Sequence, residues 1–206
     1  MFISSGTITS CKYKEDLFNT KRYNEVVQER DALRYELSQL KKSKQDSIAK
    51  LLNASVKNAL PGFAADELSV ETRNGKVYVL MSDKLLFKSG SAAVEKPGKD
   101  ALKKLSDVLH KYPTIEIMVE GHTDNVPIKT KEYKDNWDLS VARAVSIVRV
   151  MSVDQKLNPE RIVAAGRGEY QPKASNATSA GKARNRRTEI ILTPAVEENQ
   201  ALNIKK

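Results

Sequence analysis

Apolar residues in the first third of the chain recur in alternating steps of three and four, which is the spacing of one helical face. No Gly or Pro lies between Gly6 and Pro61, so nothing in the sequence breaks a helix there. We therefore predict a helical or coiled-coil spacer over residues 20–60, after an N-terminal segment of residues 1–19. The seam of this helix consists of Tyr23, Val26, Arg30, Leu33, Leu37, Leu40, Lys44, Ser47, Leu51 and Ala54.

Two interpretations of this helix stay open. Arg30, Lys44 and Ser47 interrupt the seam, and polar residues at such positions weaken a coiled coil. The helix is then either an isolated spacer or a self-associating coil that makes the protein a homodimer.

Residues 61–193 show the mixed periodicity of a compact α+β domain. Two β-rich runs flank Asn74-Gly75, which is the strongest short signal for a hairpin. We expect residues 138–152 to form a largely covered helix, because apolar side chains surround much of it. Residues 194–206 lack periodicity and predict a flexible tail. The expected strands are 68–72, 76–81, 115–120, 161–165 and 188–193, and the other expected helices are 97–112 and 178–184.

Composition limits the functions that the chain can have. The net charge of +9 makes a basic nucleic-acid-binding protein one alternative function. The basic residues are spread along the chain and no groove-reading motif appears, so we predict no nucleic-acid partner. The longest apolar run, Val77–Met81, is far shorter than the roughly 20 residues that span a bilayer. With one Cys and two His, a Cys/His-rich zinc site within one chain is excluded. We find no phosphate loop and no nucleophile beside a base, and predict no catalysis, no metal and no cofactor.

Polar residues gather at one strand end and at one helix start. Residues 121–124 follow a predicted strand, and residues 136–143 begin a helix. The loop between them can bring an acid, an Arg and free backbone N–H groups together. Such a grouping suits a zwitterion, with the Arg and amides for its carboxylate and the Asp for its ammonium group.

Five ordered motifs carry a family resemblance. Four of them are LFKSGS at 86–91, VEGHTD at 119–124, NWDLSVARA at 136–144 and NRRTEI at 185–190. The other consists of RI at 161–162, GRGE at 166–169 and Pro172. Over about residues 68–193 they resemble the successive motifs of the OmpA-like peptidoglycan-binding domain. The resemblance implies an α+β fold, an OmpA-like β/α/β/α/β domain with helices packed on a mixed sheet. It also implies non-catalytic binding of peptidoglycan through the diaminopimelate of the stem peptide.

The same resemblance implies the role of each site residue. Asp124 is expected to bind the ammonium group and Arg143 the carboxylate. An Asp–Arg bridge that only supports the fold, and Arg186 and Arg187 as a solvated strand edge, are the alternatives. His122 is expected to fix the turn. The remaining residues that the resemblance places near the pocket are Thr123, Asn136 and Leu139, with Arg187 supporting it.

The loop at 125–135 is longer than in many members of the family, and Trp137 follows Asn136. This variant is similar to the peptidoglycan-binding part of flagellar stator subunits. The alternative function is therefore part of a motor stator, although such a subunit also needs an intramembrane helix with an ionisable residue.

The residues Ile8-Thr9-Ser10-Cys11 resemble the lipobox of bacterial lipoproteins. A signal peptide needs a basic start and about 7 to 15 apolar residues, and neither precedes this motif. Cys11 is then either a free cysteine or the lipidated first residue of a mature chain whose true start lies upstream of Met1. In the second interpretation, lipid on Cys11 is the only membrane contact, and we expect a periplasmic protein anchored to the outer membrane.

Overall fold

The computed structural model describes residues 6–195, with side chains from residue 19 onward. The chain divides into two compact units, Met1–Ser43 and Lys44–Lys206. One continuous helix, α1 (Gly6–Ala59), begins earlier than the predicted residue 20. The side chain of Cys11 and residues 196–206 of the predicted 194–206 tail lie outside what is described. No helix among the described residues is both long enough and apolar enough to cross a membrane.

The two parts of α1 differ in what they bury. The seam residues Leu33 and Leu37 of the first unit are 59% and 51% exposed. In the second unit Ala49, Leu52 and Val56 are fully buried and join the core of the domain. The predicted seam is wrong there, since Leu51 is 66% exposed. The helix turns a different face to the domain, so the compact unit begins at Lys44 and not at residue 61.

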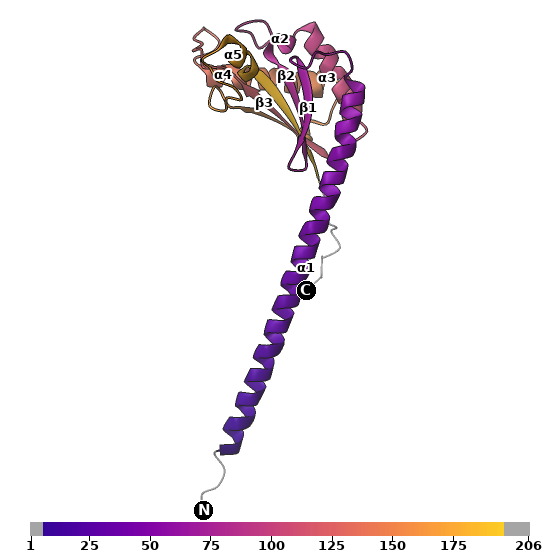
Figure 1. The fold of residues 1–206 in the computed structure, drawn as a ribbon, viewed down its shortest axis with the longest axis vertical. Helices are drawn as coiled ribbons and strands as arrows, with labels where there is room; N and C mark the ends of the chain where they lie inside the picture. The colour runs from indigo at the N-terminus through magenta and orange to yellow at the C-terminus, as the bar shows by residue number, and fades with distance from the viewer. Residues whose placement is uncertain (1–5, 196–206) are drawn as a thin grey trace, which may run out of the picture. The chain divides into compact units, whose positions relative to one another are not determined.

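Five strands form one mixed sheet in the order β1-β2-β5-β3-β4 (Figure 1). Only β3 and β4 are parallel. The predicted hairpin is confirmed: Asn74 and Gly75 have φ values of 51° and 70°, and a two-residue turn of this kind needs positive φ at both positions. The strands are β1 (Leu68–Arg73), β2 (Lys76–Ser82), β3 (Ile115–His122), β4 (Ile162–Gly166) and β5 (Arg187–Pro194).

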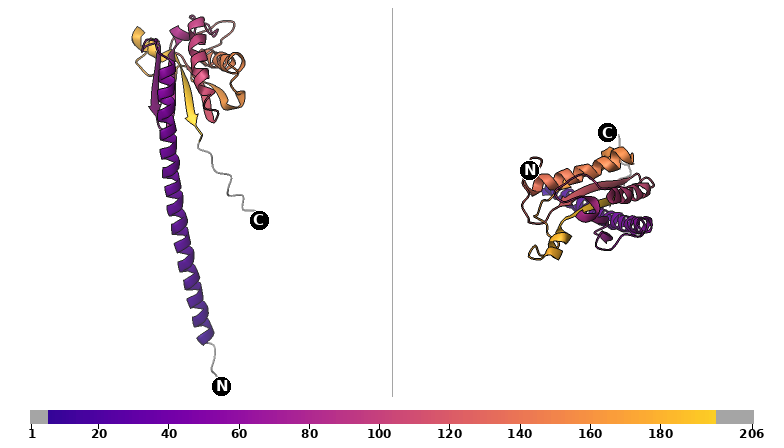
Figure 2. Two further views of the ribbon diagram at one scale, coloured as in Figure 1. Left: turned by 90° about the vertical axis from the view of Figure 1, so that its right-hand side faces the viewer. Right: turned by 90° about the horizontal axis from the view of Figure 1, so that it is seen from above.

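The last part of α1 and helices α2, α3 and α4 pack around a single apolar core on one face of the sheet, while α5 lies on the other side of the sheet (Figure 2). This confirms the expected α+β fold. Three details differ: α2 was not predicted, α4 begins two residues before 138, and Val141 is 41% exposed, so α4 is only partly covered. The helices after α1 are α2 (Asp83–Leu86), α3 (Lys96–Leu109), α4 (Asn136–Arg149) and α5 (Ser179–Asn185), with a π turn at Val150–Asp154 and a 3-10 turn at Pro159–Arg161.

Candidate functional site

A cavity of about 650 Å³ lies where the end of β3 meets α2 and the first turns of α4. Two local features position it. The Asp135 side chain caps α4 by accepting a hydrogen bond from the backbone N–H of Asp138, and Gly121 lets β3 approach α4. A Cβ atom at Gly121 would lie 2.3 Å from the carbonyl oxygen of Ser140, so only glycine fits. Five of the six predicted ligand residues line this cavity: Thr123, Asp124, Asn136, Leu139 and Arg143.

Arg143 is 3% exposed and forms a two-point ion pair with Asp83. Its Nη1 lies 2.9 Å from Asp83 Oδ1, and its Nη2 donates to Oδ2 at 3.2 Å. Its Nε donates to the carbonyl of Ser91 at 3.0 Å, so the guanidinium also holds the 88–91 loop. The remaining N–H groups are available to a ligand carboxylate.

Asp83 is the acidic partner that sequence reasoning missed. It lies outside the five motifs, and its pairing with Arg143 joins residues 60 positions apart. Burial raises the pKa of Asp83, and the positive charges of Arg143 and Arg186 partly offset that rise. Burial likewise lowers the pKa of Arg143, against the attraction of Asp83.

Asp124 is 6% exposed and binds Arg186, not Arg143. Its Oδ2 accepts from Nη1 of Arg186, and its Oδ1 accepts from the backbone N–H of Val126 at 3.0 Å. The alternative of a structural Asp124–Arg143 bridge is therefore wrong for this structure. The side chain of Arg186 is 40% exposed, so it can leave Asp124 without becoming a buried unpaired charge.

The other three predicted residues shape the wall. Asn136 donates to the carbonyl oxygens of Asp124 and Val126 and to Glu169 Oε2, the last at 2.7 Å. It thereby fixes the backbone on which Asp124 stands. Thr123 donates its hydroxyl to the Asp124 carbonyl at 2.9 Å, and Leu139, 5% exposed, adds an apolar surface.

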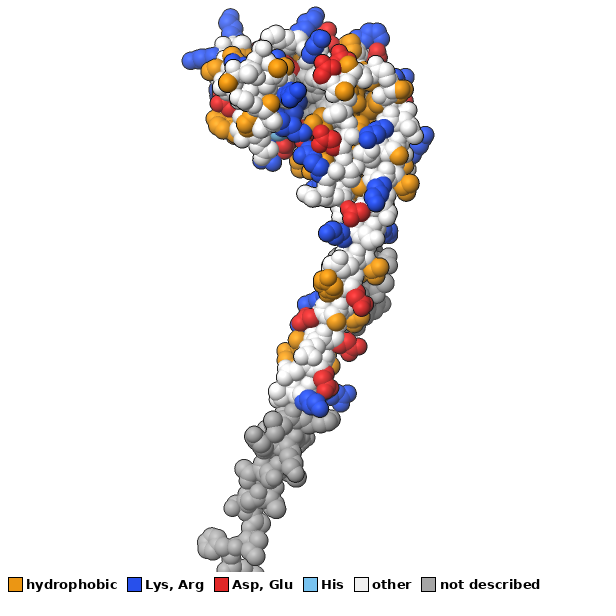
Figure 3. Space-filling view, viewed as in Figure 1, with side chains coloured by type: hydrophobic (Ala, Val, Ile, Leu, Met, Phe, Trp, Pro, Cys, Tyr) orange, Lys and Arg blue, Asp and Glu red, His pale blue; other side chains and the backbone are white. Residues whose placement is uncertain are grey.

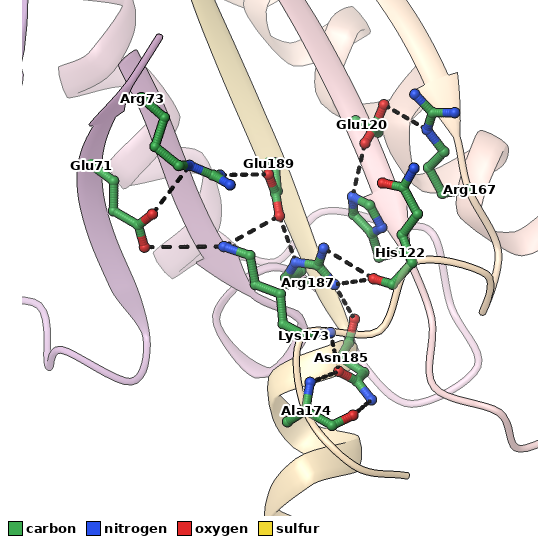
Figure 4. A network of polar contacts seen from close by, with 11 residues as sticks. Glu71, Arg73, Glu120, His122, Arg167, Lys173, Ala174, Asn185, Arg187 and Glu189 are labelled. Atoms are coloured by element: carbon green, nitrogen blue, oxygen red, sulfur yellow. Dashed lines mark hydrogen bonds and ion pairs between the residues drawn. The ribbon is translucent and has the colours of Figure 1, made fainter. Parts of the chain in front are cut away.

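Arg187 lies outside the cavity wall, on the face of the sheet opposite to α3 and α4 (Figure 4). Its Nε donates to Glu189 Oε1 at 2.7 Å, and its Nη1 and Nη2 donate to the carbonyl of Gln171. Successive side chains of a strand point to opposite faces, so Arg186 reaches the cavity while its neighbour does not. The polar network around Arg187 includes Glu71, Arg73 and Lys173.

His122 also faces this network and not the cavity (Figure 4). It is 2% exposed, and its Nε2 lies 3.2 Å from Glu120 Oε1. The contact with His122 is the main cause that lowers the pKa of Glu120, burial opposes it, and Arg167 adds to it.

On the face drawn in Figure 3, basic and acidic side chains are interspersed. Among the described residues, no group of three or more His, Cys, Asp or Glu could hold a metal ion.

The comparisons with known proteins agree on a family. Residues 86–186 match the OmpA family. Motility protein B of Bacillus subtilis is 35% identical over 71% of this chain and 59% of its own length. Probable lipoprotein YiaD of Escherichia coli is 37% identical over 60% of this chain and 54% of its own length. This chain spans less than two thirds of either relative.

One solved structure is matched by this chain over nearly the whole length of that structure. The cell wall anchor of the T6SS from Pseudomonas aeruginosa is 33% identical, with a TM-score of 0.60. The match covers 71% of this chain and 96% of that structure.

Proposed function

This chain belongs to the OmpA family, and on that premise we propose that it binds peptidoglycan without catalysis and ties a cell envelope to the wall. The cavity beside α4 is the proposed binding site, and the diaminopimelate of the stem peptide is the proposed ligand.

The observation that carries this proposal is the arrangement of charge in the cavity. Asp124 and Arg186 form one ion pair, and Asp83 and Arg143 form another, within a single wall. A zwitterion can bind there by exchanging partners, because its ammonium group replaces Arg186 at Asp124. Its carboxylate then binds Arg186 and the remaining N–H groups of Arg143, and charge-assisted bonds of this kind are the strong ones.

The tether would run through α1. A helix rises 1.5 Å per residue, so the part before the domain provides a spacer of roughly 55 Å. We propose that lipid on Cys11 anchors the spacer to the outer membrane and places the domain in the periplasm. The similarity to a probable lipoprotein supports this interpretation.

We expect the full chain to pellet with insoluble peptidoglycan and to leave its glycan and peptide bonds intact. Sedimentation followed by analysis of the supernatant for soluble muropeptides measures both points, with insoluble cellulose as the control matrix. Release of muropeptides by the pure protein would contradict the non-catalytic role. A protein that stays in the supernatant would contradict the ligand.

A second function, as the wall-binding part of a flagellar stator, is supported by one specific observation. Motility protein B of Bacillus subtilis matches 71% of this chain. Deletion of the gene separates the two functions, because loss of swimming with an intact envelope favours the stator, and envelope leakage in swimming cells favours the tether.

We propose that the exposed seam of the first unit joins two copies of the chain. Leu33 and Leu37 lie on it and are more than half exposed. We expect the wild-type chain to be a dimer and Leu33→Glu to be a monomer, since a charge at a seam position disfavours the coil. Tyr35→Glu is the matched control, because Tyr35 is 66% exposed but lies off the seam. Light scattering measures the mass of the particle in solution. A monomeric wild-type chain would contradict the dimer and favour the interpretation of the helix as an isolated spacer.

A further inference from the structure

Two aromatic side chains form an exposed stacked pair beside the cavity. The ring centroids of Trp137 and Tyr170 are 5.3 Å apart and the ring planes differ by 26°. Trp137 is 45% exposed and Tyr170 is 65% exposed, so the pair still presents apolar surface to solvent. Neither residue takes part in the charge pairs of the cavity.

Hydrogen bonds hold the pair on a firm support. Trp137 lies in the first turn of α4, where its carbonyl accepts from the Ser140 hydroxyl at 2.9 Å. That hydroxyl oxygen in turn accepts from the N–H of Gly168 at 3.1 Å, and the Gly168 carbonyl accepts from Thr123 at 2.9 Å. The loop that carries Tyr170 is therefore fixed to α4 and to the end of β3. A fixed platform loses little conformational entropy when a ligand binds.

The aromatic pair is connected to the cavity wall through Asn136. Asn136 lines the cavity, and its side chain donates to Glu169 at 2.7 Å. The chain neighbours of these two residues are the two aromatic residues, Trp137 and Tyr170. A ligand that fills the cavity and extends past Asn136 can therefore reach the aromatic pair.

We propose that Trp137 and Tyr170 bind a pyranose ring of the glycan strand whose stem peptide occupies the cavity. One face of a pyranose carries C–H groups, which pack on the electron-rich face of an aromatic ring, while indole N–H and phenol O–H groups can bind its hydroxyls. The inference rests on the proposed function, because a stem peptide is attached to a sugar only a few residues from its diaminopimelate. An extended peptide spans about 3.3 to 3.6 Å per residue, so the sugar lies near the cavity.

The chain contains one tryptophan, so its fluorescence reports on Trp137 alone. Peptide-free glycan strands, prepared by removing the stem peptides from the wall, are the probe. We expect the strands to shift the emission of the wild-type chain to shorter wavelength, since a stacked sugar removes water from the indole. Free diaminopimelate is the second probe, and it tests the cavity separately.

Variants test the contribution of each ring. Trp137→Ala and Tyr170→Ala are each expected to weaken binding of the glycan strands about fivefold. Titration calorimetry measures this affinity, because Trp137→Ala removes the only tryptophan. Trp137→Phe, which keeps a ring, should recover part of the affinity. Diaminopimelate binding should not change in any of these variants, which also shows that they are folded. Val153→Ala is the control, because Val153 is 70% exposed on the domain and lies outside the aromatic pair.

The outcomes separate this inference from the proposed function. If the glycan strands leave the emission of the wild-type chain unchanged, and both alanine variants keep full affinity for the strands, the proposed platform is overturned. If the wild-type chain binds diaminopimelate and pellets with the wall but does not bind the glycan strands, the inference of an aromatic platform is wrong while the proposed function stands. If the wild-type chain binds neither diaminopimelate nor the wall, the proposed function is wrong, and the inference that rests on it is wrong as well.

Discussion

Arg143→Ala is expected to lower the free energy of unfolding by about 3 to 5 kcal/mol, the usual cost of leaving one charge of a buried pair without its partner. The charge left behind is Asp83, which loses its two contacts with Arg143 and keeps only the more distant Arg186, at 4.0 Å. The variant also removes the bond to the Ser91 carbonyl and so loosens one wall of the cavity. Denaturant unfolding followed by circular dichroism measures the loss.

Binding of diaminopimelate to Arg143→Ala should fall by about tenfold or more, measured well below the unfolding midpoint. Arg143→Lys should recover only part of both properties, since an ammonium group cannot contact both Asp83 oxygens and Ser91 in the same geometry. Arg149→Ala is the control, because Arg149 lies exposed on the same helix and such changes are usually small. Wild-type stability and affinity in the Lys variant would show that a point charge is enough.

A double-mutant cycle assigns the stability loss to the pair. Asp83→Asn should destabilise the wild-type chain but cost clearly less in the Arg143→Ala background, because the partner is already missing. A coupling energy of about 0.5 to 3 kcal/mol is typical of residues in contact. Additive losses would mean that the two side chains support the fold independently.

Asp124→Asn is expected to weaken diaminopimelate binding by about ten- to a hundredfold, which corresponds to a charge-assisted hydrogen bond of about 1.5 to 3 kcal/mol. The substitution keeps an oxygen for the Val126 N–H but removes the charge that binds an ammonium group. Stability should change by about 1 kcal/mol or less, since the freed Arg186 is 40% exposed and can be solvated.

Melting temperature and affinity are to be measured on the same Asp124→Asn sample. Asp107→Asn is the matched control, because Asp107 is exposed on α3 and does not line the cavity. Cadaverine, which has the amines of the ligand without its carboxylates, tests the ammonium contact directly and should also bind more weakly to Asp124→Asn. A destabilised variant with undiminished affinity would assign Asp124 to the fold and not to the ligand.

Local patterns were sufficient where one segment determines its own structure. Asn74-Gly75 predicted the hairpin because its turn needs positive φ at two neighbouring residues. The ordered motifs predicted which residues come together, and Asp124, Asn136 and Arg143 do share one cavity wall. The periodicity of residues 115–120 likewise predicted β3, since Ile115, Ile117 and Val119 are buried.

Only the tertiary structure decided the partners of the charges and the face that α1 buries. A sequence shows which residues are charged, but Asp83 reaches Arg143 across 60 positions, and Asp124 reaches Arg186 across 62. The end of α1 buries Leu52 and exposes Leu51 because the facing surface comes from distant strands and helices. Apolar residues at helical spacing occur on both faces of this part of α1, so the spacing alone does not select the buried face. The sequence by itself determined the five strands, the longer helices and five residues of the cavity wall, because these depend on local spacing and on ordered motifs. The position of Asp83 in the wall and the charge pairings depend on the packing of segments that are far apart in the chain.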